Sequence, residues 1–156
     1  MNQEIERKFL VASESWRAVA DAGRICRQGY ILSGMGGVTV RVRQIGGQGY
    51  VTFKGPARGI SRAELEYEIP VADAEYMLDH FCAGHLISKV RYHVVYHGFV
   101  WEVDEFSGVN QGLVVAEIEL EREDQAFDVP EWIGAEVSHE RRYTNAALAT
   151  HPFTAW

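Results

Sequence analysis

The chain opens its regular pattern with Glu4-Ile5-Glu6-Arg7-Lys8-Phe9-Leu10-Val11. Charged side chains at Glu4, Glu6 and Lys8 alternate here with apolar ones at Ile5 and Phe9. Successive side chains of a β-strand point to opposite faces, so a period of two predicts a strand with one charged and one apolar face.

The same alternation returns in six further segments and predicts a β-rich chain. A less regular strand is expected over 24–33, which brings the total to about eight, enough to close a barrel with a ligand-sized interior. Glycine-rich turns separate the segments and favour sequential hairpins. We therefore predict a mainly β fold, a closed eight-stranded antiparallel β-barrel with short flanking helices. The six segments are 38–44, 50–54, 63–69, 89–94, 101–104 and 116–121.

Three other segments are expected to form helices that cover the outside of the barrel. Residues 71–83 place apolar side chains on one helical stripe, and residues 139–150 follow Ser138, a suitable N-cap. Residues 13–22 are the third candidate.

Length and charge limit the classes of function. A chain of 156 residues has the size of one domain, and we expect a single domain over 1–156. Its net charge of −7 disfavours nucleic acid and membrane surfaces as partners, because both attract basic proteins. Cys26 and Cys82 form no metal-binding or redox motif, and we find no signal peptide or membrane span. These features predict a cytoplasmic protein.

Like charges stand two residues apart on several predicted strands, such as Arg41 with Arg43 and Glu64 with Glu66. Charges of one sign on a strand face repel each other. One interpretation is that these faces are the solvent-exposed side of a sheet. The other is that a polyanion bound beside divalent metal offsets both kinds of charge. Single-sign pairs recur on most of the strands, which favours the second interpretation.

Other kinds of site have little support. His93 and His97 are four apart in a strand pattern, without the His-Glu-x-x-His motif of a zinc enzyme. The glycine clusters match neither a P-loop nor a dinucleotide-binding loop. No serine stands in a Gly-x-Ser-x-Gly context, so an acyl-transfer triad is disfavoured.

The N-terminal motif Glu4-Ile5-Glu6-Arg7-Lys8 resembles the Glu-x-Glu-x-Lys motif of the CYTH domain. This superfamily includes class IV adenylate cyclases, thiamine triphosphatase and the triphosphate tunnel metalloenzymes. An ordered series of further motifs extends the resemblance over nearly the whole chain, and the set looks most like the compact bacterial inorganic triphosphatases. The further motifs are Gln28-Gly29-Tyr30-Ile31, Arg41-Val42-Arg43, Thr52-Phe53-Lys54, Ser61 to Glu66, Lys89-Val90-Arg91-Tyr92, Trp101 to Asp104, Ala116 to Glu119 and Arg142 to Asn145.

The resemblance implies three groups of site residues inside an eight-stranded tunnel. The substrate-binding group is Lys8, Arg41, Arg43, Lys54, Lys89, Arg91 and Tyr30. The metal-binding group is Glu4, Glu6 and Glu119, for Mg²⁺ or Mn²⁺. Further acidic positions with a catalytic role are Glu64, Glu66, Asp104 and Glu117.

The activity implied is metal-dependent hydrolysis of a triphosphate, with inorganic tripolyphosphate as the preferred substrate. Two alternatives on the same fold are a class IV-type adenylate cyclase and a thiamine or nucleoside triphosphatase. A third is a module that binds polyphosphate without cleaving it. The expected partner is a small-molecule triphosphate, and the chain is a possible homodimer.

Overall fold

The computed structural model describes residues 2–156, and their strands form one antiparallel sheet. The strands are β1 (Asn2–Val11), β2 (Arg24–Ser33), β3 (Thr39–Ile45), β4 (Gln48–Lys54), β5 (Ser61–Ile69), β6 (Leu86–Tyr96), β7 (Phe99–Phe106), β8 (Val114–Glu119) and β9 (Ile133–Glu136).

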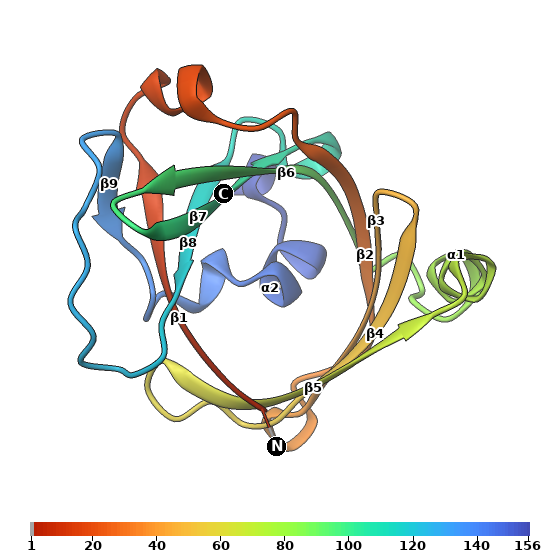
Figure 1. Cartoon of the computed structure of the whole chain (residues 1–156). Helices are drawn as coiled ribbons and strands as arrows, with labels where there is room; N and C mark the ends of the chain where they lie inside the picture. The colour runs from red at the N-terminus through yellow and green to blue at the C-terminus, as the bar shows by residue number, and fades with distance from the viewer. Residues whose placement is uncertain (1) are drawn as a thin grey trace.

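Strand β1 closes the sheet into a barrel (Figure 1). The strand order is β5-β4-β3-β2-β6-β7-β8-β1-β9, and β5 also pairs with β1. The first part of β1, residues 2–5, pairs with β5, and residues 6–10 pair with β8. The predicted closed, eight-stranded antiparallel barrel is confirmed, and the short strand β9 is an addition that pairs with the end of β1.

The apolar phase of the strands points outward, and over β7, β8 and the β3–β4 hairpin it is buried beneath other segments. Trp101 and Ile118 are fully buried in a cluster that also contains Trp16, from the 3-10 helix η1 (Ser15–Val19). Helix α1 (Val71–His80) packs against β3 and β4. Glycine permits this approach, because a Cβ at Gly49 would lie 2.8 Å from Cβ of Ala74 on α1. Apolar contacts therefore cover much of the outside of the barrel, and the charged phase of the strands faces its inside.

Two helix predictions need correction. Residues 13–22 form only the 3-10 turn η1 rather than a longer helix. Residues 139–150 divide into a 3-10 turn η4 (Arg141–Tyr143) and helix α2 (Asn145–Thr150). The N-cap of α2 is Thr144, whose extended backbone interrupts the helix and whose hydroxyl accepts a hydrogen bond from the Ala147 N–H at 3.2 Å.

Helix α2 lies within the outline of the barrel rather than on its outside (Figure 1). Leu148 of α2 is fully buried in a cluster with inward-facing Tyr30 and Ile87. This apolar cluster fills one end of the barrel and leaves the polar side chains in the remainder. In the described part of the chain, no helix has the length and apolar character needed to cross a membrane.

Candidate active site inside the barrel

Six cationic side chains from four strands point into the barrel. They come from β1, β3, β4 and β6, because the charged phase of each of these strands faces inward. Their side chains are between 1% and 13% exposed. We call them the six interior cations: Lys8, Arg41, Arg43, Lys54, Lys89 and Arg91.

Each interior cation lies within 4 Å of at least one carboxylate. Lys8 contacts Glu117 at 3.3 Å, and Lys54 contacts Glu4 at 2.7 Å and Glu64 at 3.2 Å. The other four contacts are Arg41 with Glu66 at 3.2 Å, Arg43 with Glu66 at 3.4 Å, Lys89 with Asp104 at 2.6 Å, and Arg91 with Asp104 at 2.8 Å. The structure therefore brings the charged residues of these pairs together on the inner face of the barrel, as three neighbouring clusters of ion pairs.

Asp104 is the most enclosed carboxylate of these clusters. Its side chain is 1% exposed and accepts hydrogen bonds from Lys89 Nζ at 2.6 Å and from Arg91 Nε and Nη2 at 2.8 Å. Burial alone would raise the pKa of the Asp104 carboxyl, but Arg91 and Lys89 outweigh it and lower that pKa. Asp104 is thus an ionised counter-charge that orients two interior cations.

Glu117 has the same character. It is buried between Lys8 and Arg91, which lower its pKa to about 2 against the opposing effect of burial. In return, Glu117 is the main group that raises the pKa of Lys8 despite its burial. Both groups stay charged at neutral pH, so Glu117 holds Lys8 as an ammonium.

Glu4, Glu6 and Glu119 behave in the opposite way. Burial and the charges of Glu117 and Glu4 raise the pKa of Glu6 to about 8. Burial, followed by the charges of Glu4 and Glu102, raises the pKa of Glu119. For Glu4, burial also outweighs the attraction of Lys54, and its pKa rises. The negative charge of these three carboxylates exceeds the positive charge of the cations beside them.

A divalent cation fits this excess of carboxylate. Glu6 and Glu119 are direct cross-strand partners in the β1–β8 ladder, and in the described chain neither makes an ion pair within 4 Å. Magnesium takes oxygen ligands, binds through a few carboxylates and keeps several waters. Within residues 2–156, no three His, Cys, Asp or Glu side chains already converge as a ligand set. The oxygen donors of these carboxylates would suit a hard divalent cation.

Glu64 and Glu66 differ in the number of hydrogen bonds that their carboxylate oxygens accept. Glu66 accepts hydrogen bonds from Thr52 Oγ1 at 2.7 Å and from Arg41 and Arg43. The buried Oε2 atom of Glu64 accepts no hydrogen bond in the described chain, and its one ionic contact is with Lys54 Nζ at 3.2 Å. Of the two, Glu64 is the better placed to accept a proton or hydrogen bond from water.

Tyr30, expected to bind substrate, packs instead in the apolar cluster at one end of the barrel. It is 7% exposed, lies in this cluster with Ile87, and its hydroxyl accepts a hydrogen bond from Gln28 Nε2 at 3.0 Å. Burial raises the pKa of Tyr30 despite the nearby charge of Arg41. Tyr30 therefore stays neutral.

The C-terminal segment supplies contacts that sequence reasoning missed. The Tyr143 carbonyl accepts a hydrogen bond from Lys8 Nζ at 3.2 Å, and Asn145 Oδ1 accepts one from Lys89 Nζ at 3.3 Å. The motif Arg142 to Asn145 was the only available signal, and it gives no indication that its residues enter the barrel. Thr52 was also overlooked, although it shares the inward phase of Lys54.

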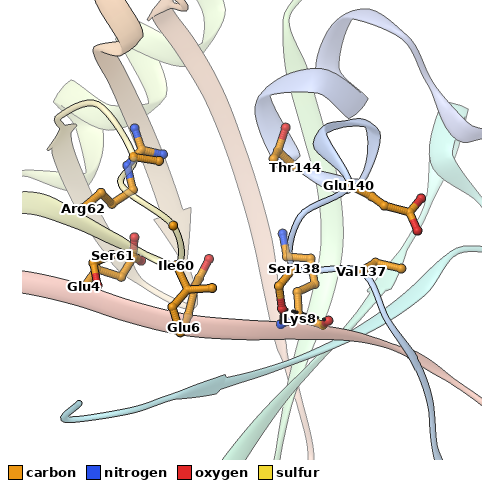
Figure 2. A pocket seen from close by; sticks show the side chains of 12 residues that line it. Glu4, Glu6, Lys8, Ile60, Ser61, Arg62, Val137, Ser138, Glu140 and Thr144 are labelled. Carbon is orange, nitrogen blue, oxygen red and sulfur yellow. Dashed lines mark hydrogen bonds between the residues drawn. The ribbon is translucent and has the colours of Figure 1, made fainter. Parts of the chain in front are cut away.

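A cavity of about 120 Å³ lies between the β4–β5 loop and the segment that follows β9 (Figure 2). Glu4, Glu6 and Lys8 of β1 line it, so it is continuous with the charged interior. Ser61 and Arg62 lie on one side, and the other side is formed by Val137, Ser138, Glu140 and Thr144 (Figure 2).

This arrangement can bind and polarise a compact polyanion. Buried cations hold anionic oxygens more strongly than exposed ones because the local dielectric is low. Electrostatic stabilisation of this kind is usually the largest contribution to phosphoryl transfer. Among the described residues, the site contains no preformed nucleophile–base pair of the acyl-transfer kind.

Comparisons with known proteins agree with this geometry. A family model for the CYTH domain matches residues 2–148. The inorganic triphosphatase of Acetivibrio thermocellus is 47% identical over 153 residues, covering 98% of this chain and 97% of that protein. The inorganic triphosphatase of Nitrosomonas europaea is 39% identical over 152 residues, covering 94% and 96% of the two chains.

Solved structures give the same picture. The crystal structure of an inorganic triphosphatase matches with a TM-score of 0.66 and 35% identity, covering 96% of this chain and 95% of the other. A putative adenylyl cyclase from Hippeastrum, described as having a dominant triphosphatase activity, matches with a TM-score of 0.53 and 15% identity. The second likeness shows the shared fold alone.

Proposed function

Because the chain belongs to the CYTH domain family, we propose that it is a metal-dependent inorganic triphosphatase that acts inside the barrel. The proposed reaction is hydrolysis of tripolyphosphate to pyrophosphate and orthophosphate, with the whole chain, 1–156, as one CYTH-like domain. The observation that carries the proposal is the gathering of six cations from four strands inside the barrel, each of them beside a carboxylate.

The interior cations would hold the triphosphate. Each cation is already oriented by a carboxylate, so its side chain loses little further conformational entropy when the substrate binds. Arginine presents a planar fork to phosphate oxygens, which suits Arg41 and Arg43, whose buried Nε atoms make no hydrogen bond in the described chain, to bidentate contacts. The fork of Arg91 is already bound by Asp104, so Arg91 would act mainly through its charge. Lys8 and Lys89 are fixed by backbone and amide oxygens of the C-terminal segment as well as by their carboxylates.

The acidic residues divide into two proposed roles. Asp104 and Glu117 keep the cations charged and in place. Glu4, Glu6 and Glu119 would hold Mg²⁺ or Mn²⁺ through their oxygens. When bound, such an ion neutralises phosphate oxygens and lowers the pKa of coordinated water.

Glu64 is our candidate for orienting the attacking water. Its buried Oε2 atom accepts no hydrogen bond in the described chain and has an ionic contact with Lys54 Nζ at 3.2 Å, whereas Glu66 already accepts three hydrogen bonds. Direct attack by water needs no covalent intermediate. The proton of that water would pass to Glu64 as the phosphoanhydride bond breaks and the leaving phosphate takes up the negative charge.

A substrate panel tests the proposal. Tripolyphosphate, pyrophosphate, ATP and thiamine triphosphate are each incubated with Mg²⁺ or Mn²⁺, and the products are separated by anion exchange. We expect tripolyphosphate to give the highest kcat/KM. Cyclic AMP from ATP, or equal turnover of ATP, would move the function to a cyclase or nucleoside triphosphatase, and tight binding without any cleavage would indicate a polyphosphate-binding module.

Cytoplasmic residence and formation of a homodimer are further proposals for this chain. The outward-facing side chains Phe53, Leu65 and Tyr67 on neighbouring strands are each more than 40% exposed, which offers an apolar surface for a second copy. Cell fractionation and sedimentation at several protein concentrations are the corresponding measurements.

A further inference from the structure

Arg62 is an arginine in the cavity of Figure 2 that the proposed mechanism does not use. It stands on β5 in the same phase as Glu64 and Glu66 and is the direct cross-strand partner of Glu4. The inward phase of β5 therefore contributes a seventh cation, at the end of the barrel where the β4–β5 loop faces the segment after β9.

Arg62 differs from the six interior cations in having no carboxylate partner. Each of the six lies within 4 Å of a carboxylate, whereas no such pair involves Arg62 in the described chain. Its Nε and Nη2 atoms both donate to the Gly55 carbonyl, at 3.0 and 2.7 Å. Its Nη1 atom makes no hydrogen bond to any residue from 2 to 156, so a charged donor stays available.

The surrounding backbone makes the cavity rigid. Arg58 and Ser61 exchange backbone hydrogen bonds of 2.7 and 3.1 Å, which closes the loop into a tight turn. The Ile60 carbonyl accepts a hydrogen bond from the Glu6 N–H at 3.4 Å, so the turn is fastened to β1. The cavity volume of about 120 Å³ is roughly ten times what one water requires, which leaves room for a phosphate group.

Two of the three carboxylates that line this cavity have an opposite charge nearby. Glu4 is 2.7 Å from Lys54, and Glu140 is 3.5 Å from Arg142. The third, Glu6, makes no ion pair within 4 Å in the described chain, and the cation that we propose for Glu4 and Glu6 would offset its charge. With that cation bound, an anion added to this cavity would meet the unpaired guanidinium of Arg62.

We propose that Arg62 forms a phosphate subsite at this end of the barrel, in addition to the phosphate positions bound by the six interior cations. The inference rests on the proposed triphosphatase function and extends it. The phosphate has two possible sources: the fourth phosphate of a linear chain longer than tripolyphosphate, or orthophosphate released by hydrolysis. The alternative is that Arg62 only anchors Gly55 and the β4–β5 loop.

Arg62→Gln tests the subsite, because glutamine can still donate to the Gly55 carbonyl but carries no charge. Arg58→Gln is the matched control, since Arg58 is an exposed arginine of the same loop that does not line this cavity. Arg62→Lys keeps the charge and should restore part of the effect. Calorimetry gives the affinities of tripolyphosphate, tetrapolyphosphate and orthophosphate with Mg²⁺, and kinetics give kcat/KM and inhibition by orthophosphate.

If the fourth phosphate is the source, Arg62→Gln lowers the affinity of tetrapolyphosphate relative to tripolyphosphate by about tenfold or more. If released orthophosphate is the source, its inhibition constant rises by a similar factor while kcat/KM for tripolyphosphate stays within about threefold. Equal changes for all three ligands, or no change for any, would overturn the subsite and leave a loop anchor. Failure of the wild-type protein to cleave tripolyphosphate would instead defeat the proposed function, and the calorimetric comparison would still test Arg62.

Discussion

Replacing Asp104 by asparagine should destabilise the protein and reduce its activity together. The substitution keeps the shape of the side chain but removes the charge that faces Lys89 and Arg91 at 2.6 to 2.8 Å. Arg91 would retain Glu102 at 2.7 Å, whereas Lys89 would keep the neutral Asn145 oxygen at 3.3 Å but no carboxylate within 4 Å among the described residues. The variant therefore leaves one ammonium in the barrel without a counter-charge.

The expected loss of stability is about 3 kcal/mol. Removing one partner of a buried ion pair costs about 3 to 5 kcal/mol. The lower end applies here, because burial and the charge of Arg91 already lower the pKa of Lys89, and the unpaired ammonium can release its proton. For a chain of this length, about 3 kcal/mol corresponds to a fall in Tm of roughly 6 to 12 °C.

Glu105→Gln is the matched control for Asp104→Asn. Glu105 is the next residue on β7 and pairs with Arg17 at 2.7 Å on the outside of the barrel, where both side chains are more than one-third exposed. Exposed pairs contribute about 0 to 1 kcal/mol. Urea titration of both variants and the wild-type protein measures the difference, and a loss below about 1 kcal/mol for Asp104→Asn would refute the role of Asp104 as a buried counter-charge.

The stability difference between wild type and Asp104→Asn should also depend on pH. The pKa of Asp104 is lowered in the folded state, so its contribution is fully present above the unfolded value of about 3.9 and is lost as pH falls through the lowered value. We expect a constant difference from pH 7 down to about 4 and a narrowing difference below that. A difference that instead narrows between pH 8 and 6 would show that another group controls it.

Three further predictions concern the proposed reaction. Arg43→Ala should lower kcat/KM for tripolyphosphate at least about tenfold, which is the effect of losing one charge-assisted contact. The control variant Arg17→Ala, on the outside of the barrel, should leave kcat/KM unchanged. Equal kinetics for the two variants would contradict an anion site inside the barrel. EDTA should abolish hydrolysis and Mg²⁺ or Mn²⁺ restore it, and undiminished turnover by metal-free protein would remove the metal assignment. Glu6→Gln should raise the Mg²⁺ concentration that gives half-maximal rate, as measured by titration, whereas an unchanged metal dependence would exclude Glu6 as a ligand.

The strands of the barrel could be predicted because each carries its own local pattern. Charged and apolar residues alternate where one face of a strand lines the interior of the barrel and the other packs beneath α1, β9 or η1. The alternation follows from the opposite directions of successive side chains in a strand. Strand β9 could not be predicted, because Ile133–Glu136 is too short to show a period and is held by pairing with β1. The interruption at Thr144 was missed for a similar reason, since a helix of six residues is stabilised by its tertiary contacts.

The β1–β8 ladder shows why the ionisation of the site residues was harder to predict than which residues form the site. Glu117 and Glu119 stand two residues apart on one strand face and look alike in the sequence, yet Glu117 has a lowered pKa and Glu119 a raised one. The antiparallel register sets Glu117 opposite Lys8, which together with Arg91 lowers the pKa of Glu117. Glu119 has no cation opposite it, and burial followed by the charges of Glu4 and Glu102 raises its pKa. A shift of this register by two residues would set Lys8 opposite Val115 or Glu119 instead of Glu117, and no local pattern in either strand excludes it. The barrel thus places carboxylates with raised pKa values directly beside an ion-paired one, which is what a site that binds a cation next to an anionic substrate requires.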